Sequence, residues 1–148
     1  MKTSLWPHKF RKISYWLIAA GVLLSYAHLK GYRPAFLDFE TFAIASTFLQ
    51  KRFFVLIENN FLDELAFLTF QMGLLLQILT EEKVSNIKHD QYRLSSFIFS
   101  LKYTFLCLLL SYLLVFGYLS ILLISSAFSL FCILYIVRFQ YLLKRSVD

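Results

Sequence analysis

The chain has 148 residues, of which 59% are apolar, 19% are aromatic and 16% are charged. Soluble domains are about 45–50% apolar and about 25% charged, so this composition excludes both an ordinary soluble globule and a disordered segment. The two cysteines cannot build a disulfide framework. The net charge is +6, and the 15 Lys and Arg lie beside apolar runs, a placement typical of membrane proteins rather than of nucleic-acid-binding domains. We therefore predict an all-α integral membrane protein whose surroundings are the lipid bilayer, with no nucleic-acid partner.

The first expected span is the uncharged stretch 13–29, which follows a basic tail. Its 17 residues are close to the minimum for a span, because a helix that rises about 1.5 Å per residue needs roughly 17 to 25 residues to cross the hydrocarbon core. The basic tail, the apolar run and the small residues Ser25 and Ala27 would also fit a cleavable signal peptide. We favour the uncleaved span, and the signal peptide remains an alternative.

Residues 30–60 form a long connection of about 30 residues that mixes charges with short apolar runs. Gly31 and Pro34 are expected to end the first helix, and a loop of this length usually has structure of its own. Alternation along 37–43 suits a β-strand, whereas Phe42, Ser46 and Leu49 would suit one face of a short interfacial helix. The sequence does not choose between the two.

The second expected span covers 61–79, with Asn60 as a candidate N-cap. Asp63 and Glu64 occupy its first turn, where acidic side chains interact favourably with the positive end of the helix dipole. The polar residues 80–96 that follow are expected to form a short aqueous loop.

Residues 97–137 contain a single charge, Lys102, and are too many for one span. A turn at Gly117 to Ser120 would divide them into a third span at 97–116 and a fourth at 119–137. The complete prediction is one integral membrane domain, residues 1–148, folded as a four-transmembrane-helix bundle with an ordered outer loop.

The positive-inside rule gives the expected orientation. With the N-terminus inside, 11 of the 15 Lys and Arg lie on the cytoplasmic side and 4 lie in the long loop outside. We therefore expect both termini in the cytoplasm and the protein in the inner, or plasma, membrane.

Candidate functional residues fall into three places along the chain. Gln71 lies near the middle of the second span, where an unpaired amide is costly. Packing between helices is its first interpretation, and substrate binding is the alternative.

Oxygen-rich residues at the outer end of the second span could attract a hard cation, although capping and solvation explain them more simply. Charged residues of the inner loop could form a docking site. These two groups comprise Glu58, Asn59, Asn60, Asp63 and Glu64 outside, and Glu82, Asp90 and Arg93 inside.

Recognisable chemistry is not expected. The sequence contains no CxxC, HExxH, GxSxG or phosphate-binding glycine loop, so we predict no catalytic residues, no metal and no cofactor. Stripes of small polar residues at helical spacing are explained most simply by close helix packing. They are Ser100, Thr104, Cys107 and Ser111 on the third span and Ser125, Ser129 and Cys132 on the fourth.

Part of this pattern resembles a group of small uncharacterised bacterial four-span membrane proteins. The resemblance covers about residues 50–140. It rests on Glu58-Asn59-Asn60, Asp63-Glu64, Gly73, Glu82-Lys83, Asp90, Arg93, Ser96, Tyr103 and Arg138-Phe139. It implies the four-span topology and no particular activity.

The functional hypothesis is a non-enzymatic protein that acts as an interaction or accessory subunit of a membrane complex, with a membrane-protein partner or a second copy. A small transporter or channel subunit is the main alternative, supported by Gln71 and the polar stripes. A membrane-embedded redox enzyme or a sensor is the less favoured alternative.

Overall fold

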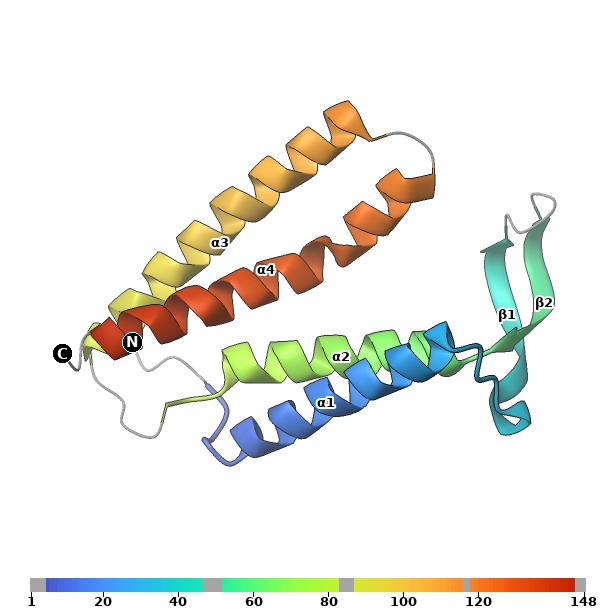
Figure 1. Cartoon of the computed structure of the whole chain (residues 1–148), viewed down its shortest axis with the longest axis horizontal. Coiled ribbons are helices and arrows are strands. Elements are labelled where there is room, and N and C mark those ends of the chain that lie inside the picture. The colour runs from blue at the N-terminus through green and yellow to red at the C-terminus, as the bar shows by residue number, and fades with distance from the viewer. Residues whose placement is uncertain (1–4, 47–51, 83–86, 116–117, 146–148) are drawn as a thin grey trace. The chain divides into compact units, whose positions relative to one another are not determined.

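The computed structural model describes residues 5–46, 52–82, 87–115 and 118–145. It is mostly helical (Figure 1). The elements in chain order are α1 (Phe10–Leu29), the short 3-10 helix η1 (Ala35–Leu37), β1 (Asp38–Ser46), β2 (Arg52–Asn60), α2 (Leu62–Leu79), α3 (Ile87–Leu114) and α4 (Tyr118–Arg145). They form two compact units, one of residues 1–15 and 71–148 and one of residues 16–70.

Three helices among the described residues are long and apolar enough to cross a membrane. Their spanning segments are Leu62–Leu79, Lys88–Leu114 and Leu122–Arg145. They overlap most of the expected second, third and fourth spans, so a helix able to span a membrane is confirmed at each of these three positions. α1 is a helix where the first span is expected, but it is not among the three.

α1 ends where the glycine was expected to end it. The amide of Lys30 donates a hydrogen bond to the carbonyl of Tyr26 at 3.1 Å. The amide of Tyr32 donates one to the carbonyl of Ala27, also at 3.1 Å. Gly31 between them has φ +78°, a left-handed conformation that costs little only without a Cβ.

α1 and α2 approach closely within the unit 16–70. A Cβ atom added to Gly21 would lie 2.7 Å from both the backbone nitrogen and the Cβ of Phe70. Only a residue without a side chain allows this approach.

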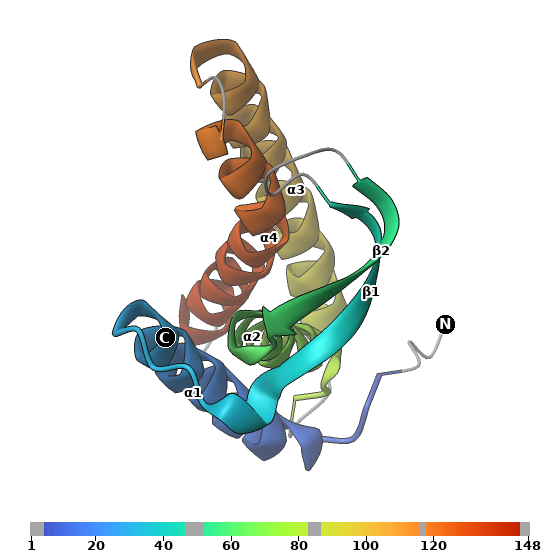
Figure 2. The same ribbon diagram turned by 90° about the vertical axis from the view of Figure 1, so that its right-hand side faces the viewer.

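A β-hairpin occupies most of the long connection and favours the strand over the interfacial helix. β1 and β2 pair antiparallel, with Asp38 opposite Asn60 and Ser46 opposite Arg52 (Figure 2). The chain is therefore mostly helical rather than all-α. Leu49, which the helical alternative required, lies outside the described residues.

The hairpin is attached directly to the start of α2. The amide of Phe61 donates to the carbonyl of Leu37 at 3.0 Å, and the rings of Phe39 and Phe61 pack edge to face with centroids 6.2 Å apart. The side-chain oxygen of Asn60 accepts a hydrogen bond from the amide of Leu62 at 3.3 Å, which confirms its expected capping role.

α3 and α4 pack side by side as an antiparallel pair (Figure 1). Phe97 and Phe131 contact edge to face with centroids 5.5 Å apart, and the guanidinium of Arg138 lies 4.9 Å from the ring centre of Phe99. The turn expected at 117–120 is wrong at its end, because α4 already begins at Tyr118, and residue 117 lies outside the described part.

The expected aqueous loop 80–96 is wrong in its second half. α3 begins at Ile87, so residues 87–96 are helical. Their charges do not prevent the helix, because Asp90 lies in its first turn and Arg93 reaches backbone carbonyls at the end of α2.

Candidate functional site

Most of the residues predicted to lie at the outer end of the second span line an open groove in the unit 16–70, which we call the outer groove after that prediction. Its volume is about 610 Å³. The lining residues come from the end of α1, the base of the hairpin and the start of α2, and they are His28, Arg33, Asp38, Glu58, Asn59, Asn60 and Asp63. The structure thus brings four of the five predicted outer residues together and adds His28 from the last turn of α1 and Arg33 from the connection after it.

The two asparagines hold the walls of this outer groove. The amide nitrogen of Asn60 donates to Asp38 Oδ1 at 2.6 Å and to the carbonyl of Pro34 at 3.1 Å. Asn59 donates to Glu64 Oε1 at 2.6 Å, so Glu64 supports the rim without lining the groove. Within the described residues, no three His, Cys, Asp or Glu side chains are grouped so that they could hold a metal ion.

Gln71 joins α2 to α4. Its side-chain nitrogen donates to the hydroxyl of Ser129 at 2.6 Å, and the residue is only 8% exposed. Its amide oxygen is buried without a hydrogen-bond partner, as is the hydroxyl of Thr104 on α3. The pairing with Ser129 supports the interpretation of Gln71 as a contact between helices.

The polar stripe of α3 is satisfied largely within its own helix. The hydroxyls of Ser100 and Ser111 donate to the carbonyls of Phe97 and Cys107, at 3.0 and 2.7 Å. Ser96, one turn earlier, donates to the carbonyl of Tyr92 at 2.7 Å. Ser96 and Ser100 are fully buried, which fits small residues at a packing face.

Arg93 holds the C-terminal end of α2 from α3. Its guanidinium donates to the carbonyls of Ile78 at 3.0 Å and Thr80 at 2.7 Å. It also lies 5.1 Å from the ring centre of Phe139 on α4. The last carbonyls of a helix have no partner inside the helix, so a cation placed there both completes hydrogen bonds and meets the negative end of the dipole.

The segment before α1 pairs with the residues after α2. The amide of Trp6 donates to the carbonyl of Leu79, and the amide of Glu81 donates to the carbonyl of Trp6, both at 2.9 Å. The side chain of His8 hydrogen-bonds to the carbonyl of Glu81 at 3.1 Å.

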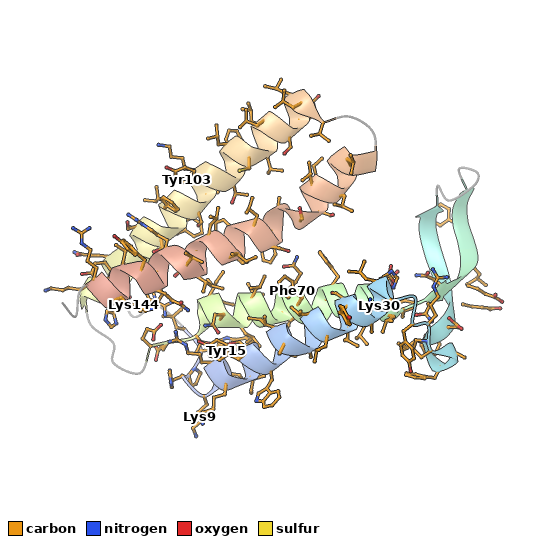
Figure 3. The ribbon with its side chains drawn as sticks, in the orientation of Figure 1. Lys9, Tyr15, Lys30, Phe70, Tyr103 and Lys144 are labelled. Carbon is orange, nitrogen blue, oxygen red and sulfur yellow. The ribbon has the colours of Figure 1, made fainter. Side chains whose placement is uncertain are left out.

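Side-chain bonds reinforce this pairing at the start of α1. Arg11 forms an ion pair with Glu82, and Ser14 donates to Gln77. Gln77 in turn donates to the hydroxyl of Tyr15 at 3.1 Å; Tyr15 is labelled in Figure 3. Burial lowers the pKa of Arg11, but its hydrogen bonds with Tyr15 and Glu82 outweigh this and raise the pKa above its usual value, so Arg11 stays charged at any physiological pH.

Two of the three inner residues predicted from the sequence therefore contribute to this inner cluster, which we define as Trp6, Arg11, Gln77, Glu82 and Arg93. Asp90 is exposed and does not belong to it. The inner cluster holds helix ends together; its carboxylate and its guanidinium groups are already bonded.

The sequence does not predict the pairing of Trp6, Arg11 or Ser14 with residues at or just after the end of α2. Their partners lie more than 60 residues away along the chain, for example 71 residues for Arg11 and Glu82. The basic tail was interpreted through its charge alone, and no local pattern marks such a distant pair.

Comparison with known proteins gives no relative: no family model, no curated protein and no solved structure matches the chain.

Proposed function

We propose that this chain is a four-span protein of the inner membrane, with both termini in the cytoplasm, and that it works as a non-enzymatic interaction or accessory subunit of a membrane complex. In this proposal α1 is the first span, and the helical part of the chain forms the bundle. The excess of Lys and Arg at 2–12, 83–93 and 138–145 supports the orientation.

The observation that carries this proposal is the bare apolar surface of the α3–α4 pair. Only 11% of the spanning window of α3 and 17% of that of α4 is buried within the chain. Large side chains such as Leu106, Leu113 and Ile124 are 48%, 59% and 59% exposed. Lipid accommodates such a surface, and helices with this much exposed apolar surface also offer it to the helices of another protein.

A photo-crosslinking amino acid at Leu113, on the exposed face of α3, tests for a partner in the native host. We expect discrete crosslinked bands that mass spectrometry assigns to one protein, either another membrane protein or a second copy. A matched probe at Cys132, which is fully buried, should give none of these bands. Only lipid adducts at Leu113, together with a lone species after purification in mild detergent, would contradict the accessory-subunit proposal.

Labelling of single cysteines tests the orientation. In a background lacking Cys107 and Cys132, we expect Glu58→Cys to react with a membrane-impermeant maleimide in intact cells. Asp90→Cys should react only after the cells are opened. Both positions are exposed in the structure, so a missing signal reflects the membrane. Labelling of Asp90→Cys alone in intact cells would reverse the orientation.

A small transport subunit is the second candidate, favoured by the two unpaired polar atoms at Gln71 and Thr104. Gln71→Leu separates the two functions. Hydrogen bonds between helices in a bilayer contribute on average only about 0.6 kcal/mol, so we expect this variant to fold and to assemble with its partner normally. Growth or flux that is lost while assembly is unchanged would favour transport.

A further inference from the structure

The outer groove combines acidic and basic side chains, none of which forms an ion pair with another within the described residues. Arg33 and His28 lie on its walls together with the carboxylates of Asp38, Glu58 and Asp63. Among the described residues the ion pair of Arg11 and Glu82 is the only one, and it lies elsewhere. Carboxylates and a guanidinium around one cavity suit a ligand that carries both a cation and an anion.

The position of the outer groove defines which ligands it meets. Asp63 lies in the first turn of α2, a helix able to span a membrane, and His28 lies in the last turn of α1. The end of a spanning helix lies at the level of the lipid head groups. Two residues after His28, the ammonium of Lys30 lies 5.5 Å from the ring centre of Tyr26, and Tyr is a residue typical of that level (Figure 3 labels Lys30).

We infer that the outer groove binds a ligand that carries a phosphate and a primary ammonium group, the head group of a phosphoethanolamine lipid. This inference rests on the proposed membrane function. Arg33 binds the phosphate through charge-assisted hydrogen bonds, with His28 beside it. Glu58 and Asp63 accept hydrogen bonds from the ammonium.

The composition of the groove explains the choice of a primary amine. Its carboxylates outnumber its guanidinium, so a purely anionic head group would leave them unpaired. A trimethylammonium group has no N–H to donate to them. The volume of about 610 Å³ lies within the range of small-ligand sites, about 300–1,000 Å³.

The test uses the full chain, purified in mild detergent and incubated with phosphatidylethanolamine, phosphatidylcholine or phosphatidylglycerol. Native mass spectrometry then measures how much lipid the protein keeps. We expect the ethanolamine lipid to be retained over both others. Loss of one charge-assisted contact weakens binding by about tenfold, so Arg33→Gln should reduce retention by this factor. Lys30→Gln, a nearby exposed cation outside the groove, should leave retention unchanged.

A second groove variant, a competition experiment and a membrane-extraction control complete the test. Glu58→Gln removes a different exposed charge and should abolish the preference for ethanolamine over choline, which guards against a folding defect in one variant. Soluble phosphoethanolamine should compete if the head group alone is recognised, and failure to compete would indicate that the lipid tails contribute. Equal retention of the three lipids, or wild-type retention by both groove variants, would overturn the inference. Resistance of the protein to alkaline extraction from membranes is measured separately, and its failure would instead overturn the membrane proposal.

Discussion

Arg93→Ala is expected to lower the free energy of unfolding by about 3 kcal/mol, because charged hydrogen bonds contribute about 1.5–3 kcal/mol each and a buried acceptor left without its donor is costly. The guanidinium holds two carbonyls at the end of α2 and packs on Phe139. Alanine removes all three contacts at once. Lysine keeps the charge but cannot reproduce the planar, forked pair of hydrogen bonds, so Arg93→Lys should recover only part of the loss.

Unfolding of the purified protein in mixed detergent micelles, followed by Trp fluorescence, measures this effect. Lys88→Ala is the matched control, because Lys88 is a cation near the start of the same helix but is exposed. It should change the unfolding free energy by less than about 0.5 kcal/mol. Equal effects of the two variants would show that Arg93 acts through its charge alone and not as the cap of α2.

Gly21→Leu is expected to have a comparable effect, about 3 kcal/mol, the upper end of the usual cost of overpacking. The new Cβ would lie 2.7 Å from the backbone nitrogen of Phe70, and backbone inside a helix cannot move aside as a flexible side chain can. Leucine has the better helix propensity, by about 1 kcal/mol, but that gain is smaller than the cost of the clash.

Ala19→Leu is the control for Gly21→Leu, since Ala19 lies two residues earlier on α1 and is exposed. The same micelle unfolding assay should give Ala19→Leu a stability close to that of the wild-type protein. Wild-type stability of Gly21→Leu would contradict the close approach of α1 and α2 within the unit 16–70.

The sequence predicts the helices better than it predicts their ends. Hydrophobic stretches indicate the positions of α2, α3 and α4, and Gly31 indicates the end of α1, because burial in lipid and a left-handed backbone depend on nearby residues only. The start of α3 at Ile87 is missed, since a charged segment next to a span resembles a loop until the partner of Arg93 is known.

The candidate residues that are close in sequence are predicted, and those that are distant in sequence are not. Glu58, Asn59, Asn60 and Asp63 are close in sequence, and the structure places them around one groove. Their basic counterparts, Arg33 and His28, meet them only because the hairpin pairs Asp38 with Asn60 and so folds the long connection back on itself. Long-range pairing of this kind leaves no periodic pattern in the sequence, and neither does the pairing of Trp6 with the residues after α2.

The segment before α1 pairs with the end of α2, so its partner residues are synthesised much later than the segment itself. His8 leaves the ribosome 73 residues ahead of its partner Glu81. At about 5–20 residues per second, that interval is about 4–15 s. During this time the start of the chain remains without its final hydrogen bonds, so α1 leaves the ribosome before the residues that pair with the segment ahead of it have been made.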